Sequence, residues 1–166
     1  MSGISQDAQE IYKIAYDQGL ARLDSQESNL SALRQRATTI ISISGLAATL
    51  FGREALAEPS GTTLWLDMGA YEWLAVACFG VSLLCTIEVL RPKGGWHSHF
   101  TPSGIIYQFA EGEKATTLSN TYKVLAEFSE DNFEKNMQIL HPLYIWFNIS
   151  LFAVVMQIFF WVVAIR

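Results

Sequence analysis

Apolar residues gather in three segments of the chain, which are separated by ordinary polar sequence. The last segment, 142–165, has no charged residue and forms about 36 Å of helix, enough to cross a hydrocarbon core of about 30 Å. The second segment, 68–90, has Glu72 and Glu88 near the ends of its uncharged stretch. Both segments carry aromatic residues near their ends, as transmembrane helices do. Each segment therefore predicts a transmembrane helix.

The first apolar segment, 37–57, is the most difficult to assign. Its uncharged run between Arg36 and Arg53 has only about 16 residues, which is short for a membrane span. Long arginine side chains can reach from a short span to both interfaces. We interpret this segment as a third transmembrane helix that packs against other helices. A re-entrant or surface hairpin is the alternative.

Small and hydroxyl-bearing residues recur at helical spacing in these segments. Such residues let helices approach closely in lipid and form hydrogen bonds between them. In the first segment one row holds Thr38, Ser42, Gly45 and Thr49, and a neighbouring row holds Ser44, Ala48 and Gly52. The second segment offers a matching seam at Ala75, Cys78, Ser82 and Cys85, and the third contributes Asn148, Ser150 and Gln157 as candidates for interhelical hydrogen bonds. All these residues are predicted to pack helices together or to line a pore.

The polar regions predict two amphipathic helices. Residues 1–36 contain a seam whose steps alternate between three and four residues, as in paired helices. Its members are Tyr12, Tyr16, Gly19, Leu23, Gln26, Leu30, Leu33 and Ala37. Residues 91–141 contain a loop and a second helix with an apolar face and an acidic face. The apolar face holds Leu118, Tyr122, Leu125, Phe128, Phe133, Met137 and Leu140, and the acidic face holds Glu127, Glu130, Asp131 and Glu134. Both helices are predicted to continue into the next span, with a kink at Pro142.

The distribution of Lys and Arg predicts the orientation in the membrane. These residues lie mainly in 1–36 and 91–141, whereas the short connection 58–67, which is predicted to be an outer loop, has only Arg53 on its flank. Positively charged segments stay in the cytoplasm. The prediction is an all-α integral membrane protein with three transmembrane helices, a cytoplasmic N-terminus and an external C-terminus. The two cytoplasmic helices are continuous with the first and third spans. Because two helices bury little core, we also expect a homo-oligomer.

Composition excludes one class of partner and limits the role of cysteine. The chain has 166 residues, of which 51% are hydrophobic and 16% charged, and its net charge is −5. Without a cluster of Lys and Arg, a nucleic-acid partner is not expected. Cys78 and Cys85 lie two turns apart on one helix, too far to bridge, and are interpreted as small packing residues. No cleavable signal peptide is expected.

Candidate chemistry in the sequence is sparse. His97 and His99 resemble a metal-binding pair, but no third ligand lies in their loop, and exposed loop histidines are the simpler interpretation. Glu72 and Glu88 would suggest an ion path if both lay deep in the bilayer, whereas positions near the span ends make them interfacial. Catalytic triads and phosphate-binding glycine loops are absent from the sequence. We therefore predict no enzyme activity, no cofactor and no metal.

Two stretches of the chain carry a family resemblance. "LDSQESNLSALRQRATTIISISGLAATLFG" resembles the start of the first span in the SLATT and Pycsar-type transmembrane effectors of bacteria, and "EDNFEKNMQILHPLYIWFNISLFAVVMQIFFW" is similar to the helix leading into their final span. The resemblance covers residues 22–56 and 125–162. It implies an inner-membrane effector of antiphage defence, triggered by a nucleotide-signalling partner. The sequence shows no nucleotide-binding domain, so the resemblance supplies no binding residues.

These observations predict an oligomeric protein of the bacterial inner membrane. Its leading function is that of a regulated effector that perturbs the membrane or forms a pore, with membrane lipid as its first partner. The alternative is a non-catalytic scaffold or sensor that recruits a soluble cytoplasmic partner through residues 91–141. A small transporter or channel subunit is a further interpretation, and a membrane enzyme is the last.

Overall fold

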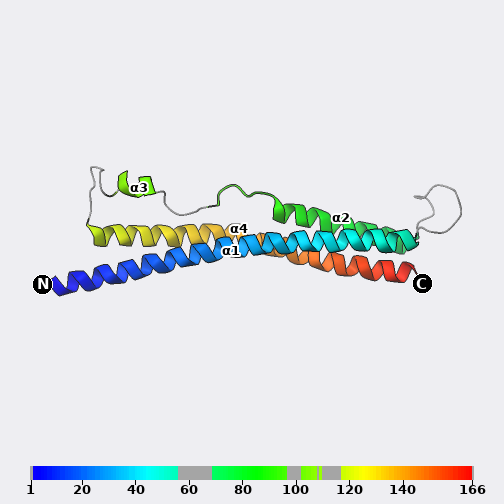
Figure 1. Cartoon of the computed structure of the whole chain (residues 1–166), viewed down its shortest axis with the longest axis horizontal. Helices are drawn as coiled ribbons and strands as arrows, with labels where there is room; N and C mark the ends of the chain where they lie inside the picture. The colour runs from blue at the N-terminus through cyan, green and yellow to red at the C-terminus, as the bar shows by residue number, and fades with distance from the viewer. Residues whose placement is uncertain (1, 56–68, 97–101, 108, 110–116, 166) are drawn as a thin grey trace. The chain divides into compact units, whose positions relative to one another are not determined.

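Helices dominate the computed structural model, which describes residues 2–55, 69–96, 102–107, 109 and 117–165. In chain order they are α1 (Ser2–Ala55), α2 (Ala70–Leu90), α3 (Pro102–Ile106) and α4 (Leu118–Ala164) (Figure 1). No strand occurs in those ranges, so the predicted all-α fold class is confirmed for them. The predicted outer loop, 58–67, lies outside the described residues.

The ends of the helices follow from local backbone chemistry. Gly69 precedes α2 in an extended conformation, with φ −70° and ψ 170°. α2 stops at Arg91 because the ring of Pro92 disfavours helical geometry in the residue before it. α4 continues through Pro142, at the loss of one backbone hydrogen bond. The polar and apolar parts of α1 and α4 are thus joined in single helices.

Two helices, α2 and α4, are long and apolar enough to cross a membrane. α1 is longer than either, but its apolar part is interrupted by hydroxyl-bearing residues and does not reach the same apolarity. The membrane span predicted at 37–57 therefore stays a prediction.

The chain divides into two compact units. One consists of Met1–Leu30 and Lys93–Leu140, and the other of Ser31–Pro92 and His141–Arg166. The long helices α1 and α4 contribute residues to both units.

In the first unit, α1 and α4 lie side by side and run in the same direction (Figure 1). The rings of Tyr16 and Tyr122 have centroids 6.1 Å apart, and further along both helices Gln26 bonds to Phe133. The buried residues of α1 in this unit are Gly19, Leu23, Gln26 and Leu30. Those of α4 are Leu125, Ser129, Asn132, Asn136 and Leu140. Both sets follow the three- and four-residue steps of paired helices.

The buried face of α4 in this unit is more polar than the sequence pattern predicts. Leu118 and Met137, which that pattern assigns to the apolar face, are 55% and 44% exposed. Ser129, Asn132 and Asn136 take the buried positions instead. These two residues of the predicted apolar face are therefore not part of the buried seam, because a spacing argument that counts only apolar residues cannot place a polar seam.

The second unit is a bundle of three helical segments. α1 and α4 again run in the same direction, since Ser44 bonds to Gln157 and, further along, Gly52 lies against Trp161. α2 runs in the opposite direction beside them (Figure 1). Its buried residues are Ala75, Ser82, Cys85, Thr86 and Val89.

Candidate functional site

Polar side chains occupy the centre of the second unit, and they form the candidate functional site. Each is at most 1% exposed: Ser44 from α1, Ser82 and Thr86 from α2, and Ser150 and Gln157 from α4. Buried polar groups are stable only when they are hydrogen-bonded. All five residues make such bonds, in two separate clusters.

The first cluster joins α1 to α4 through two reciprocal hydrogen bonds. The hydroxyl of Ser44 donates to Oε1 of Gln157 at 2.5 Å, and Nε2 of Gln157 donates to the backbone carbonyl of Ser44 at 3.0 Å. The amide of Gln157 thus uses its donor and its acceptor on the same residue. This geometry fixes how the two helices are aligned along their axes.

The second cluster joins α2 to α4 through three hydroxyl groups. The Ser150 hydroxyl lies 3.0 Å from that of Ser82 and 2.9 Å from that of Thr86. It also lies 3.2 Å from the backbone carbonyl of Ser82, to which it donates. Ser82 and Thr86 are one helical turn apart, so both reach Ser150 from the same face of α2.

Large apolar side chains cover the outside of the same unit. Leu84 is 68% exposed, Phe152 66%, Leu50 65% and Val155 57%. In a water-soluble bundle most of these exposed positions would carry polar side chains. A polar centre inside an apolar surface is typical of helices that associate in lipid.

Three predicted hydroxyl residues of α1 lie on the exposed side. Thr38, Ser42 and Thr49 donate to carbonyl oxygens of their own helix, at 3.0, 3.0 and 2.9 Å respectively. Gly45 lies in the same row, and a Cβ added there would meet no atom of the chain within 4 Å. In this row, Thr38–Ser42–Gly45–Thr49, the three hydroxyl residues are exposed and Gly45 is half-exposed, and the hydroxyl groups bond to α1 itself and not to the described parts of α2 or α4.

The remaining predicted residues of α1 belong to the neighbouring row. Ser44 and Gly52 are buried, and Ala48 is partly exposed. The ring of Trp161 lies against Gly52, where an added Cβ would be 3.5 Å from the ring. A small residue at 52 therefore allows Trp161 to approach the α1 backbone.

The predicted seam of α2 lies mostly inside the bundle. Ala75, Ser82 and Cys85 are buried, whereas Cys78 is partly exposed. On α4, Gln157 is buried and Asn148 is exposed. Thr86 was not among the residues predicted to pack helices together, although its position one turn after Ser82 was a signal for it.

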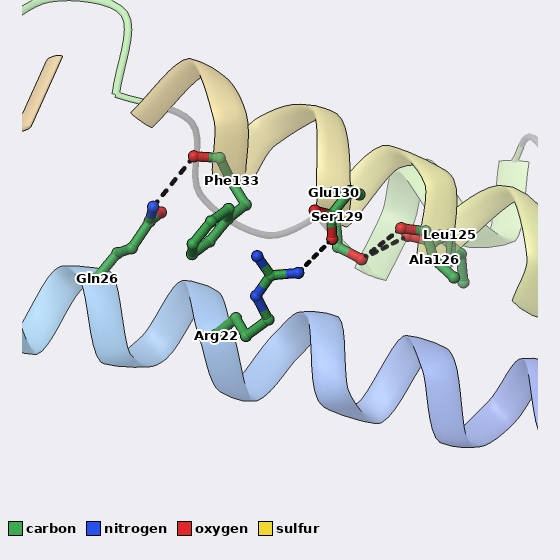
Figure 2. Close-up of polar contacts among 7 residues, drawn as sticks. All are labelled: Arg22, Gln26, Leu125, Ala126, Ser129, Glu130 and Phe133. Carbon is green, nitrogen blue, oxygen red and sulfur yellow. Dashed lines mark hydrogen bonds and ion pairs between the residues drawn. The ribbon is translucent and has the colours of Figure 1, made fainter. Parts of the chain in front are cut away.

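A second polar cluster lies between α1 and α4 in the first unit (Figure 2). Nη1 of Arg22 donates to Oε2 of Glu130 at 2.6 Å, and the Arg22 guanidinium lies 3.9 Å from the centre of the Phe133 ring. Nε2 of Gln26 donates to the backbone carbonyl of Phe133 at 3.0 Å, while its Oε1 is buried and has no hydrogen-bond partner among the described residues. Gln26 belongs to the seam that the spacing of α1 predicts, whereas no pattern in the sequence predicts its bond to Phe133 or the Arg22–Glu130 pair.

Close backbone approach accompanies that cluster. Gly19 of α1 faces Ser129 of α4, and a Cβ at Gly19 would collide with the Ser129 hydroxyl. Ser129 turns this hydroxyl toward its own helix, 3.0 Å from the carbonyl of Leu125 and 2.9 Å from that of Ala126 (Figure 2). The glycine thus allows a polar residue to fit into the seam.

Tyr16 lies at the other end of the seam and has a perturbed phenol. Burial raises the pKa of Tyr16 above its ordinary value of 10.0, and the negative charges of Asp17 and of ionised Tyr122 raise it further. The phenol therefore stays neutral where it packs against Tyr122.

The described residues contain no group of three or more His, Cys, Asp or Glu side chains that could hold a metal ion. His97 and His99 lie outside those residues. Comparisons with known protein families, with curated proteins and with solved structures found no match. The arrangement of side chains is therefore the basis for any proposal about function.

Proposed function

We propose that this protein is an oligomeric protein of the bacterial inner membrane that acts as a regulated membrane-perturbing effector. The observation that carries the proposal is the apolar surface of the second unit, where residues such as Leu84 and Phe152 are exposed while Ser44 and Gln157 are buried. In hydrocarbon, exposed apolar side chains are favourable and buried hydroxyl and amide groups hold helices together. α2 and α4 have the length and apolarity for this environment.

In this proposal, α1 supplies a third span although its composition alone is too polar. Its hydroxyl groups are satisfied, either by Gln157 or by carbonyls of α1 itself. Satisfied hydroxyl groups cost much less in lipid than free ones. The distribution of Lys and Arg favours an N-terminus in the cytoplasm. In that orientation α1 and α4 both cross the membrane from the inside to the outside, and α2 crosses it from the outside to the inside.

The row Thr38–Ser42–Gly45–Thr49 supports the effector role. It gives α1 a small and weakly polar face that no described part of the chain covers. In an assembly of several copies, this face would pack against another α1 helix or line a water-filled path. The family resemblance supports a trigger by a nucleotide-signalling protein, and hence a role in antiphage defence.

A membrane-potential dye in bacteria that express the protein tests this function. Wild type is expected to depolarise the inner membrane, and Gly45→Leu is expected to abolish the effect because a bulky side chain blocks the open row. Gly80→Leu is the matched control, since Gly80 of α2 also has no atom within 4 Å of an added Cβ. Ser44 is unsuitable for this test, because its replacement would break the bond to Gln157 inside the chain.

Each outcome of the dye experiment is informative. Loss of depolarisation in Gly45→Leu but not in Gly80→Leu supports an assembly built on this row. Equal loss in both variants contradicts a specific role of the row. A silent wild type contradicts an autonomous effector and favours the scaffold interpretation.

The scaffold or sensor function has one observation in its favour. Residues at the end of α3 are exposed although they are large and apolar, with Ile106 51% and Tyr107 75% exposed. Such residues recur in surfaces that bind proteins. Pull-down from cells with the full-length protein, compared with a double variant Ile106→Ser and Tyr107→Ser, tests this function. A partner that the wild type retains and the double variant loses would favour it.

A further inference from the structure

A second row of residues on α1 follows the alternating three- and four-residue steps of paired helices. Its members are Ile11, Ile14, Gln18, Ala21, Ser25 and Ser28, and we call it the outer row. All six are exposed, with Ile11 at 63% and Ile14 at 56%. α4 packs on a different face of α1, through Gly19, Leu23 and Gln26. The outer row is thus a second pairing face without a partner in the described part of the chain.

Charged residues flank the outer row asymmetrically. Ile11, Gln18 and Ser25 are seven residues apart and begin three successive heptads. The residue before each of them is acidic: Glu10, Asp17 and Asp24. The opposite flank holds Ala15, Arg22 and Asn29. The outer row itself contains no charge. Two-helix interfaces have mainly apolar seam positions between charged flanks, and here Ile11, Ile14 and Ala21 supply the apolar part while the other three positions are uncharged.

This asymmetry distinguishes between partners and directions. If two copies of α1 pair in parallel, the acidic flank of one faces the flank with Arg22 of the other, so Asp17 lies opposite Arg22 of the second copy. If they pair in opposite directions, the acidic flanks face each other and repel. Arg22 can serve both contacts, because Glu130 engages only Nη1 and the side chain is 48% exposed.

We propose that the outer row binds the outer row of a second copy of this chain, in parallel and in register, so that α1 pairs with α4 on one face and with its own copy on another. The proposal deepens the proposed function, because it names the surface through which copies assemble outside the apolar segments. It rests on that function for the common direction of the copies, which share one membrane. Small residues at 21, 25 and 28 permit close approach, and the two isoleucines supply the apolar contact.

Disulfide cross-linking of the full-length protein in membranes tests this pairing. Cys78 and Cys85 are first replaced by alanine, and single cysteines are then placed in the outer row, as Ile14→Cys or Ser28→Cys. Lys13→Cys and Glu27→Cys are the matched controls, because each is exposed and immediately precedes a test position but lies about 100° around the helix. A disulfide requires Cα atoms within about 4.4–6.8 Å, so only directly opposed positions form it.

We expect Ile14→Cys and Ser28→Cys each to form a covalent dimer several-fold more readily than the preceding control. Two copies in opposite directions can oppose only one of the two positions, so dimer at one position alone overturns the proposal. Equal reaction at test and control positions shows random collision and also overturns it, as does no reaction. Asp17→Arg in the Ile14→Cys background should lower the yield. Cross-linking measures a covalent dimer, whereas the dye measures ion flow. The pairing can therefore be confirmed when the effector function is not, and the effector function can be confirmed when the pairing is not.

Discussion

Gln157 and Ser44 are joined by two hydrogen bonds that use both ends of the Gln157 amide, 2.5 Å to the hydroxyl and 3.0 Å to the backbone carbonyl of Ser44. The two residues come from α1 and α4, which are far apart in sequence. In a membrane, the environment proposed for this unit, such pairs would set the alignment of the helices, because apolar contacts to lipid and to neighbouring helices differ little.

We predict that this pair is energetically coupled. In a double-mutant cycle with Ser44→Ala and Gln157→Leu, the coupling is expected near the average for interhelical hydrogen bonds in membranes, about 0.6 kcal/mol, and not above the maximum of about 1.7 kcal/mol. It is not expected to be larger, since a serine hydroxyl that loses its partner can turn to a carbonyl of its own helix. Reversible unfolding in mixed detergent micelles, followed by circular dichroism, gives the four free energies.

A second cycle provides the control for this prediction. Ser82 bonds to Ser150 in the other cluster, so Ser82→Ala and Gln157→Leu should have additive effects, within about 0.5 kcal/mol. Equal coupling in both cycles, or none in the first, would contradict a specific Ser44–Gln157 interaction.

Gly19 and Gly45 predict opposite responses to the same substitution. Alanine favours the helix over glycine by about 1 kcal/mol in each case. At Gly45 an added Cβ meets no atom within 4 Å, so Gly45→Ala should stabilise the protein by up to about 1 kcal/mol. At Gly19 the Cβ collides with Ser129, and overpacking costs about 1–3 kcal/mol, so Gly19→Ala should destabilise.

Denaturant unfolding of the two variants measures the difference in sign. Ser129→Gly in the Gly19→Ala background removes the colliding atoms and should recover part of the loss. If Gly19→Ala stabilises the protein as much as Gly45→Ala, then α1 and α4 do not approach closely at Gly19.

The spacing of residues in α1 indicates much of its buried face. Of the predicted seam, Tyr12 and Tyr16 are half-buried. The seam residues from Gly19 to Ala37 are buried, because steps of three and four residues keep one face of a helix turned to its neighbour. The same steps lead from Ala37 to Ile40, Ser44 and Ala47, all of them buried. Continuing the seam beyond Ala37 would therefore have predicted that Ser44 is buried and that Thr38, Ser42 and Thr49 are exposed.

The sequence of α4 alone does not predict which of its polar residues are buried, or what they bond to. Ser129 is buried because Gly19 of α1 leaves room for it, and no pattern within α4 contains that information. Likewise, Ser150 was a candidate for a hydrogen bond, but its partners Ser82 and Thr86 depend on how α2 packs. Spacing indicates which face is buried, and the partner helix decides which polar residues that face accepts.

Gln26→Leu is expected to stabilise the first unit. Gln26 is buried in the seam between Leu23 and Leu30, and its Oε1 has no hydrogen-bond partner among the described residues. The bond that leucine would remove goes to the carbonyl of Phe133, which lies in the interior of α4 and retains its intrahelical bond. Burying leucine should therefore gain on the order of 1 kcal/mol, as when a polar seam residue is replaced in paired helices.

Thermal unfolding compares this variant with Glu27→Leu, an exposed neighbour that should change stability little. A loss of stability in Gln26→Leu would mean that the amide has a buried partner beyond the described residues.

Tyr16 predicts a loss of stability at high pH. Burial, followed by the charges of Asp17 and Tyr122, raises its pKa above the ordinary value of 10.0 in the folded protein. The folded state therefore holds the phenolic proton more tightly than the unfolded state does. This contribution is complete below pH 10.0 and is lost as the pH rises through the higher pKa of the folded state.

Ultraviolet absorbance titrations of wild type and of Tyr16→Phe are compared. The difference between the two curves gives the ionisation of the Tyr16 phenol. Asp17→Asn should lower the pKa of Tyr16 toward 10.0 without restoring it fully, because burial is the larger cause. Tyr16→Phe should also make the unfolding free energy less dependent on pH above 10.0. If Tyr16 ionises at or below its ordinary pKa, its ring is not enclosed between α1 and α4, and the pairing of Tyr16 with Tyr122 fails with it.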